Sequence, residues 1–421
     1  MYYKGKTGII SIPNMGYTKA AIKGISWMSS FKIATRAMSI LKVVILARVL
    51  SPAQFGIFGI ASLVLVFLQV ITETGVNVIL IQSKKEISEY VNSAWVISII
   101  RGFIIFLIIV SLSPFIATFF KNSNAIPILL LIGVVPLIDG FINPSEVKFQ
   151  KELKFNNEFW FRTSIFFVDA LTAIIFAVLT HSVYSLIFGL YAGALFELIV
   201  SFLIKPTPKL EFKFDYLKEL FHKGKWVTAY GILAYFGENG DNIVVGRAMG
   251  ASPLGIYEMA YTISIAPLSE ISDVINQVVF PVYSKIQENR KRLLLAFAKT
   301  TLFISLGAAI VGGIIFFFPA QIITILLGTK WLSAVPALRI LAIYGILRAV
   351  SAPASVVFLA VGRQNYVTVM TFARFAALIV TIYPLVVSFG LVGAAYSALL
   401  SVVIEIPVIV FLFIKIFIHT K

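Results

Sequence analysis

The sequence contains no cysteine and only three histidines, His181, His222 and His419, which lie far apart along the chain. The missing cysteines exclude disulfide bonds, haem attachment by cysteine and thiolate metal sites, and such scattered histidines form no metal-binding motif. Charged residues are also scarce, at 13% of the chain, against about 25% in an ordinary soluble protein. So few charges cannot cover a soluble globule of 421 residues, which excludes the soluble enzyme classes.

Apolar side chains, in contrast, make up 59% of the residues, a composition suited to solvation by lipid. A helix needs about 20 apolar residues to cross a bilayer, and long apolar runs bounded by charge predict an all-α, multi-pass membrane protein of about twelve spans. The first six are expected near residues 24–47, 54–81, 93–119, 125–145, 163–180 and 183–204. The second six are expected near residues 226–246, 254–281, 300–318, 332–357, 365–387 and 390–414.

The net charge of +16 punctuates the apolar runs and does not gather as a nucleic-acid-binding surface would require. When the N-terminus is placed inside, the cytoplasmic connections hold 24 of the 35 Lys and Arg residues, and the external connections hold four. Because cytoplasmic loops carry this excess, both termini are expected in the cytoplasm. Residues 1–18 lack the apolar run of a removable signal peptide, so the first span is expected to direct insertion.

The two halves of the sequence resemble each other at a constant offset of 199 residues. The matching pairs are Trp27 and Trp226, Arg48 and Arg247, and Gly56 and Gly255, each glycine being followed by Ile and an aromatic residue. Such a repeat predicts two six-helix bundles, 1–204 and 226–421, joined by a cytoplasmic linker, 205–225. Because both halves begin inside, a parallel pseudo-two-fold axis along the membrane normal relates them, and transporters place substrate sites at such repeat interfaces.

The stretch Val44–Ala61, VILARVLSPAQFGIFGIA, resembles the signature of the polysaccharide and O-antigen flippases of the multidrug/oligosaccharidyl-lipid/polysaccharide exporter superfamily. The segments Thr74–Gln82, Val279–Pro281 and Ala360–Gln364 carry the same resemblance. The likeness implies a MATE-like fold and a transporter that flips a lipid-linked oligosaccharide across the cytoplasmic, or inner, membrane by alternating access. The implied partners are that substrate, membrane lipids and the polysaccharide assembly machinery.

Ionisable groups inside spans are costly in lipid and are therefore the first functional candidates. Lys32 and Arg36 lie four residues apart on one face of the first span, where they suit a pyrophosphate or an acidic sugar in a water-filled cavity. The other interpretation is that this helix begins among the lipid headgroups and both side chains snorkel. Arg101 in the third span is a cavity candidate with the same alternative. Arg348 in the tenth span completes the group and is placed, by repeat position, to pair with Asp139.

Polar stripes mark the second and eighth spans, which are equivalent in the repeat. Gln69 and Glu73 share one face of the second span, and Glu258 and Asp273 lie in a similar stripe on the eighth. Stripes on paired helices predict a shared aqueous lining, with Gln69 among the substrate-binding residues. The alternative interpretation is hydrogen bonding between helices.

The seventh span adds Glu238, Asp241 and Asn242 within one turn. We expect Glu238 and Asn242 to contact substrate. A buried carboxylate suits a coupling proton or sodium ion, because cation binding compensates its charge. The ion-coupling candidates are Glu73, Asp241, Glu258 and Asp273. No catalytic residue, metal site or cofactor is expected.

Two other functions remain open at this stage. A multidrug or organic-cation antiporter of the same superfamily needs an acidic cavity, which the carboxylates of the second half would supply. A membrane glycan polymerase or ligase needs a sizeable external loop with catalytic side chains. The longest external connection, near residues 319–331, offers only Lys330 as an ionisable group, so this class is the least favoured.

Overall fold

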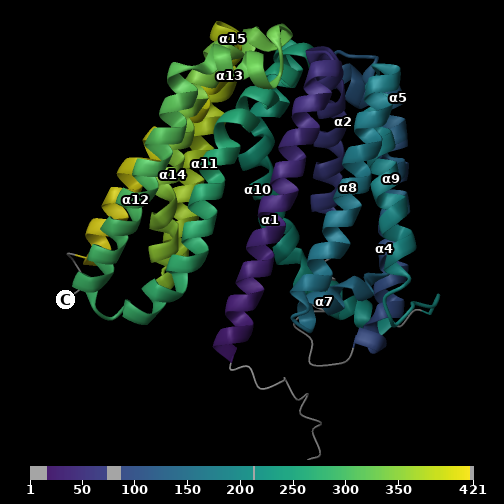
Figure 1. The fold of residues 1–421 in the computed structure, drawn as a ribbon, viewed down its shortest axis with the longest axis horizontal. Helices are drawn as coiled ribbons and strands as arrows, with labels where there is room; N and C mark the ends of the chain where they lie inside the picture. The colour runs from purple at the N-terminus through teal and green to yellow at the C-terminus, as the bar shows by residue number, and fades with distance from the viewer. Residues whose placement is uncertain (1–16, 74–86, 212–213, 418–421) are drawn as a thin grey trace, which may run out of the picture.

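The computed structural model describes residues 17–73, 87–211 and 214–417, and every element within those ranges is a helix (Figure 1). The first group is α1 (Tyr17–Val49), α2 (Pro52–Ile71), α4 (Ile87–Phe119), α5 (Ala125–Ile132), α6 (Val134–Gly140), the 3-10 helix η1 (Pro144–Val147), α7 (Lys148–Lys151), α8 (Phe155–Thr180) and α9 (Tyr184–Ser201). The second group is α10 (Phe214–Met249), α11 (Ala251–Ile286), α12 (Arg290–Phe317), α13 (Pro319–Leu326), the 3-10 helix η2 (Thr329–Ala334), α14 (Val335–Ala360) and α15 (Gln364–Phe417).

Every predicted span overlaps a helix, but the span expected at 125–145 is broken. Gly133 separates α5 from α6, and a bend of 67° separates Ala125–Gly140 from Pro144–Lys151, where Pro144 begins η1. Proline has no N–H for the preceding turn and proline-containing segments commonly kink, which accounts for the change of direction at the end of α6.

The last two predicted spans form the single element α15, whose backbone is non-helical at Gly390, with a φ of 60°. Glycine tolerates this left-handed conformation because it has no Cβ. The chain therefore changes direction at Gly390, and α15 is two helices joined at a sharp kink.

Seven of the described helices are long and apolar enough to cross a membrane, or eight if the bent pair around α5–α7 is one span. The prediction of an all-helical, multi-pass membrane protein is confirmed. The expected number of about twelve spans is higher than this count for two reasons. First, α1, α10 and α11, with 33, 36 and 36 residues, are not among the seven, and each carries charged and polar residues along its length. Second, α15 contains two predicted spans in one element.

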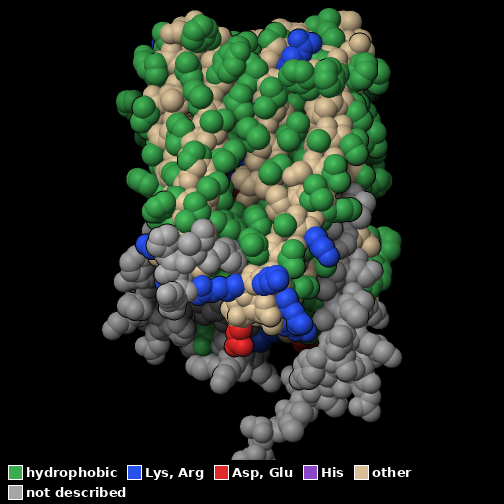
Figure 2. Space-filling view, turned by 90° about the vertical axis from the view of Figure 1, so that its left-hand side faces the viewer, with side chains coloured by type: hydrophobic (Ala, Val, Ile, Leu, Met, Phe, Trp, Pro, Cys, Tyr) green, Lys and Arg blue, Asp and Glu red, His purple; other side chains and the backbone are tan. Residues whose placement is uncertain are grey.

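The outer surface is apolar where lipid would contact it. Figure 2 shows the side of the molecule that carries α12, with hydrophobic side chains over most of its height and Lys and Arg gathered toward the lower end. On α12 the exposed apolar residues include Leu302, Phe303, Leu306 and Ile310. An apolar belt with most of the visible cations toward the lower end and a smaller group at the upper end is the pattern expected of helices in a bilayer with basic residues at headgroup level.

The helices form two groups in Figure 1, with α2, α4, α5, α8 and α9 on one side and α11 to α15 on the other. The groups lie closest together at the end that carries α5 and α13, called the upper end below. The described chain begins and ends at the opposite, lower end, where α7 lies. One buried hydrophobic cluster draws on both groups, with Leu46 and Ile60 from the first and Tyr257 and Trp331 from the second.

The flippase-like stretch identified in the sequence forms the turn from α1 into α2 at the upper end. The Oγ of Ser51 accepts a hydrogen bond from the Gln54 backbone N–H at 3.3 Å, and the Gln54 Oε1 accepts one from the Ser51 N–H at 2.8 Å. This capping box, with Pro52 in the first turn, satisfies N–H groups that would otherwise lack partners at the helix start. The stretch thus fixes where α2 begins.

Candidate functional site

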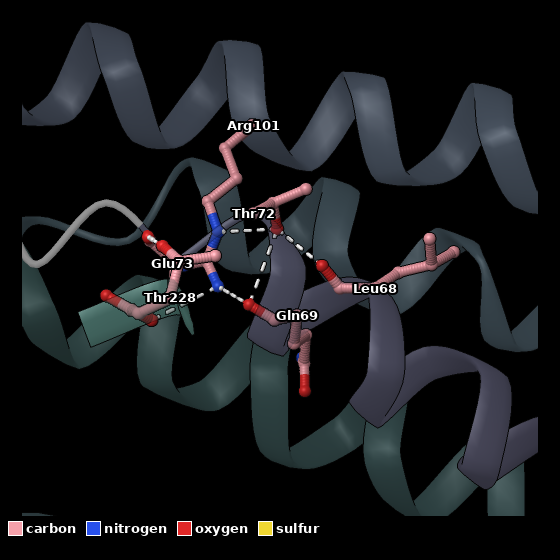
Figure 3. A network of polar contacts seen from close by, with 6 residues as sticks. All are labelled: Leu68, Gln69, Thr72, Glu73, Arg101 and Thr228. Atoms are coloured by element: carbon pink, nitrogen blue, oxygen red, sulfur yellow. Dashed lines mark hydrogen bonds and ion pairs between the residues drawn. The ribbon is translucent and has the colours of Figure 1, made fainter. Parts of the chain in front are cut away.

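Arg101 of α4 lies at the centre of a polar cluster where α2 ends (Figure 3). One guanidinium nitrogen, Nη2, donates to the backbone carbonyl of Gln69 at 2.6 Å and lies 3.3 Å from the Glu73 Oε2. The Nε donates to the Thr72 hydroxyl at 3.1 Å. The cluster extends to the second group of helices, because Thr228 of α10 donates its hydroxyl to the Glu73 carbonyl at 2.7 Å.

This geometry satisfies backbone groups at the C-terminus of α2, where helix carbonyls lack partners within the helix and a cation complements the helix dipole. Gln69 takes part through its carbonyl, while its amide is directed away from the guanidinium in Figure 3. From the sequence, Gln69 and Arg101 were separate cavity candidates and Glu73 an ion-coupling candidate, and the structure brings the three together. Within this structure Arg101 holds the end of α2 against α4.

A second cluster surrounds Arg348 of α14. Its Nη1 donates to the Tyr344 hydroxyl at 2.9 Å and to the Tyr261 hydroxyl at 3.2 Å. Because these tyrosines lie on α14 and α11, the guanidinium joins two helices of the second group. The pairing of Arg348 with Asp139 anticipated from the repeat is not formed: Asp139 lies within electrostatic range of Arg101 instead.

Asp241 of α10 is buried beside this cluster. Its Oδ2 accepts a hydrogen bond from the buried Tyr257 hydroxyl at 2.8 Å, and its Oδ1 accepts one from the Asn242 backbone N–H at 2.9 Å. The Asn242 side chain keeps a buried oxygen without a hydrogen-bond partner. Glu238, one turn earlier, is exposed. The three polar residues predicted on this helix therefore differ in environment, and Asp241 is the most enclosed.

Glu258 of α11 is half-buried and faces α2. Its Oε2 would lie 2.6 Å from a Cβ built on Gly59, so the carboxylate occupies the space that this glycine leaves. The side chain of Asp273, the remaining ion-coupling candidate, lies outside the described residues. A proton or cation site on α10 and α11 would therefore draw on Asp241 and Glu258.

The two basic residues of α1 differ in their contacts. The Arg36 Nε lies 3.7 Å from the Glu270 Oε1 of α11, with about a third of each side chain exposed (34% and 39%). This ion pair joins the first helix group to the second. Lys32 is half-buried, and its ammonium has no hydrogen-bond or ion-pair partner within the described part of the chain. Sequence reasoning identified Arg36 but missed Glu270, which follows Ser269 on the polar stripe of α11.

Sequence reasoning also missed two enclosed ion pairs. The Lys42 ammonium of α1 lies 2.8 and 2.7 Å from the two carboxylate oxygens of Asp169 on α8, and both side chains are largely buried. The Arg374 Nη1 lies 3.4 Å from the Oε2 of the fully buried Glu405, and this ion pair joins the parts of α15 before and after its kink. The sequence does show single charged residues within apolar spans, which indicates that each needs a partner. Only the tertiary arrangement shows which acid pairs with which base.

Comparison with known families gives one match over most of the chain. The profile of the family described as "Polysaccharide biosynthesis protein" matches residues 45–336. Among curated relatives, the lipopolysaccharide biosynthesis protein WzxC of Escherichia coli is 25% identical over 83% of this chain and 72% of its own length. The teichuronic acid biosynthesis protein TuaB of Bacillus subtilis is 26% identical over 83% of this chain and 73% of its own length.

Solved structures share the fold at low sequence identity. The lipid II flippase MurJ, in an inward closed conformation, superposes with a TM-score of 0.74 at 18% identity, covering 92% of this chain and 88% of its own. A MATE family multidrug resistance transporter of the MOP superfamily, in an inward-facing conformation, gives a TM-score of 0.70 at 15% identity, covering 91% and 94%. The predicted MATE-like architecture is confirmed.

Proposed function

Because the chain belongs to the family of polysaccharide biosynthesis proteins, we propose that it is a transporter that flips a lipid-linked oligosaccharide from the inner to the outer leaflet of the cytoplasmic membrane. The observation that carries this proposal is the family match over residues 45–336, which spans parts of both repeated halves. WzxC and TuaB support it because their names assign them to lipopolysaccharide and teichuronic acid biosynthesis. The fold shared with a lipid II flippase and a MATE transporter supports transport in preference to an enzyme activity.

In the proposed architecture, twelve crossings form two six-helix bundles, residues 1–204 and 226–421, with both termini and the 205–225 linker in the cytoplasm. The bundles rock about the parallel pseudo-two-fold axis, and the glycan headgroup passes between them while the lipid stays in the bilayer. A ligand drives such a cycle only if its affinity differs between the two states. The helix groups lie closest together at the upper end in Figure 1, and the proposal takes the lower end as the cytoplasmic one.

The headgroup would be bound by the cations near the contact between the bundles. Arg36 is the strongest candidate, because its side chain is about a third exposed and its partner Glu270 belongs to the other bundle. An anionic phosphate or acidic sugar would compete with Glu270 for this guanidinium, and Arg binds two phosphate oxygens at once. Lys32, one turn away, supplies a second positive charge on the same face.

The remaining candidates divide by exposure. The exposed Glu238 suits hydrogen bonding to sugar hydroxyls, with Asn242, Gln69, Arg101 and Arg348 as further polar groups around the path. The enclosed carboxylates suit the coupling proton or sodium ion, because a buried anion is stabilised by a bound cation. Asp241 and Glu258 are coupling candidates on this ground, and Glu73 and Asp273 are candidates from the sequence alone.

The test uses a host strain that lacks the gene for this chain and so displays no surface polysaccharide. Wild-type chain should restore the polysaccharide, whereas Arg36→Ala and Glu238→Ala should accumulate lipid-linked glycan facing the cytoplasm at normal protein levels. The control is Lys154→Ala, whose exposed side chain lies at the lower end, outside the helix contacts between bundles. Normal surface polysaccharide from both site variants would remove the site assignment. Wild-type chain that confers resistance to organic cations without restoring polysaccharide would favour the antiporter.

Topology can be tested separately, because the chain has no cysteine and any introduced cysteine is the single reactive thiol. Cysteines at Lys4 and Lys209 should both be labelled only from the cytoplasmic side. Ser123→Cys, at the upper end, should be labelled only from outside. Labelling of Lys4→Cys and Lys209→Cys from opposite sides would refute the parallel repeat.

A further inference from the structure

The helix pair α2 and α11 makes a reciprocal contact at the upper end. A Cβ built on Gly56 of α2 would overlap the carbonyl oxygen of Ala251 on α11. A Cβ built on Gly255 of α11 would overlap the carbonyl oxygen of Pro52 on α2. Both glycines are buried. Pro52 and Ala251, like Gly56 and Gly255, are 199 residues apart, so each half makes the same contact with the other.

Neither glycine is needed for its own backbone conformation. Both lie within helices, and neither has the positive φ found at Gly250, Gly328 and Gly390. A helix normally gains stability when alanine replaces an interior glycine. The missing side chain is therefore required by the approach of the other half.

Two further contacts on either side of the glycines follow the same repeat. Arg48, at the end of α1, donates to the carbonyls of Ile325 and Leu326 at the end of α13. Its repeat partner Arg247, at the end of α10, lies over the Phe119 ring at the end of α4, 5.3 Å from its centroid. Each arginine thus contacts the connection after the third predicted span of the opposite half.

Trp331 of η2 closes one side of this region. It is fully buried, donates its Nε1–H to the Ala47 carbonyl at 2.8 Å, and packs edge-on against Phe55 with ring centroids 5.4 Å apart. Lys330 beside it donates to the Arg48 carbonyl at 2.9 Å. The upper end is therefore closed by backbone contact at its centre and by side-chain docking around it.

We propose that this contact is the outer gate of the transporter, and that Gly56 and Gly255 set the equilibrium between its closed and open states. The proposal rests on the function proposed above. At Gly56 and Gly255 the two helices meet through backbone surfaces, so no interlocking side chains oppose their separation at this point. When they are apart, a methyl group on either glycine has no clash. Substitution therefore penalises the closed state alone and shifts the population toward the outward-open state.

The experiment measures distances between spin labels by double electron–electron resonance, with the full-length protein in lipid nanodiscs. The labels are placed on exposed cysteines introduced at Ser123 and Thr329 to report on the upper end, and at Asn156 and Gln287 to report on the lower end. Wild-type protein should show one short upper distance. Gly56→Ala and Gly255→Ala should each populate a longer upper distance together with a shorter lower distance.

The size of the shift follows from overpacking. Inserting a methyl group into a close contact should change the ratio of open to closed molecules by roughly 5- to 150-fold. The matched control is Gly313→Ala in α12, where a Cβ would have no atom within 4 Å, and it should leave both distances unchanged. Trp331→Phe, which keeps an aromatic ring but removes the N–H that bonds to Ala47, should shift the populations in the same direction by less.

Unchanged distance distributions in folded Gly56→Ala and Gly255→Ala would overturn the gate. So would a loss of folded protein in these variants together with unchanged distances in Trp331→Phe, because the contact would then be a permanent part of the fold. The labels report on the two halves without any substrate. Failure of wild-type chain to restore surface polysaccharide would therefore refute the proposed function and leave this measurement standing.

Discussion

Removing the positive charge of Lys42 should destabilise the protein far more than removing that of an exposed lysine in an equally short ion pair. Lys42 Nζ and the Asp169 Oδ2 lie 2.7 Å apart, with 14% and 12% of the side chains exposed. Breaking a buried pair by removing one partner costs about 3–5 kcal/mol, because the other charge is left without compensation. Since the pair retains some exposure, we expect Lys42→Met to lower the unfolding free energy by about 2–4 kcal/mol.

The chain offers a matched control. Lys154 Nζ and the Glu152 Oε2 also lie 2.7 Å apart, but 53% and 37% of these side chains are exposed. An exposed ion pair contributes about 0–1 kcal/mol, so Lys154→Met should cost no more than that. The two variants remove the same group at the same distance and differ in the burial of the pair.

The assay is reversible denaturation in mild detergent, followed by tryptophan fluorescence. A double-mutant cycle with Asp169→Leu separates the pair from its surroundings: Lys42→Met/Asp169→Leu should recover most of the stability lost by either single variant, because no unpaired charge remains. The reasoning is refuted if Lys42→Met costs no more than Lys154→Met, or if the losses of the single variants simply add.

Three other substitutions test buried polar contacts by the same assay. Asn143→Ala should lower the free energy of unfolding by about 2–3 kcal/mol, because the fully buried amide donates to the Ser201 carbonyl at 3.1 Å and its removal leaves buried polar groups without a hydrogen-bond partner. A loss below about 1 kcal/mol would mean that water replaces the Asn143 amide. Tyr257→Phe should cost about 1–3 kcal/mol by removing the donor to the buried Asp241, and wild-type stability would contradict the contact. Arg101→Lys keeps the charge but cannot span both partners at the end of α2, so we expect a loss of about 1–2 kcal/mol; equal stability would show that the charge alone suffices.

The helical fold and the repeat could be predicted from the sequence because each produces a pattern of residues along the chain. A bilayer requires long apolar runs, and charge marks their ends. The repeated Arg and Gly residues at a spacing of 199 also predicted which positions are equivalent. The structure gives their physical reason: Gly56 and Gly255 are kept small by the opposite half, and Arg48 and Arg247 both contact it.

The interior contacts could not be predicted, because a helix that is apolar on every side does not reveal which face meets which neighbour. Lys42 and Asp169 are 127 residues apart, and nothing along the chain relates them. The expected pairing of Arg348 with Asp139 failed for a different reason. Repeat-equivalent positions meet only if they lie close to the axis that we propose relates the halves. Gly56 and Gly255 lie near each other, whereas Arg348 bonds to two tyrosines and Asp139 lies within electrostatic range of Arg101.

The same geometry separates structural charges from those that can take part in transport. Lys42 and Asp169 both belong to the first half, so the rigid-body rocking proposed above would leave their distance unchanged. Arg36 and Glu270 belong to different halves, so any such motion must change their separation and expose the guanidinium to a competing anion. We therefore expect charge-neutral variants of the first pair to lower stability, and Arg36→Gln to slow transport at unchanged stability. A stability loss in Arg36→Gln equal to that of Lys42→Met, with normal surface polysaccharide, would show that the halves do not move apart at this pair.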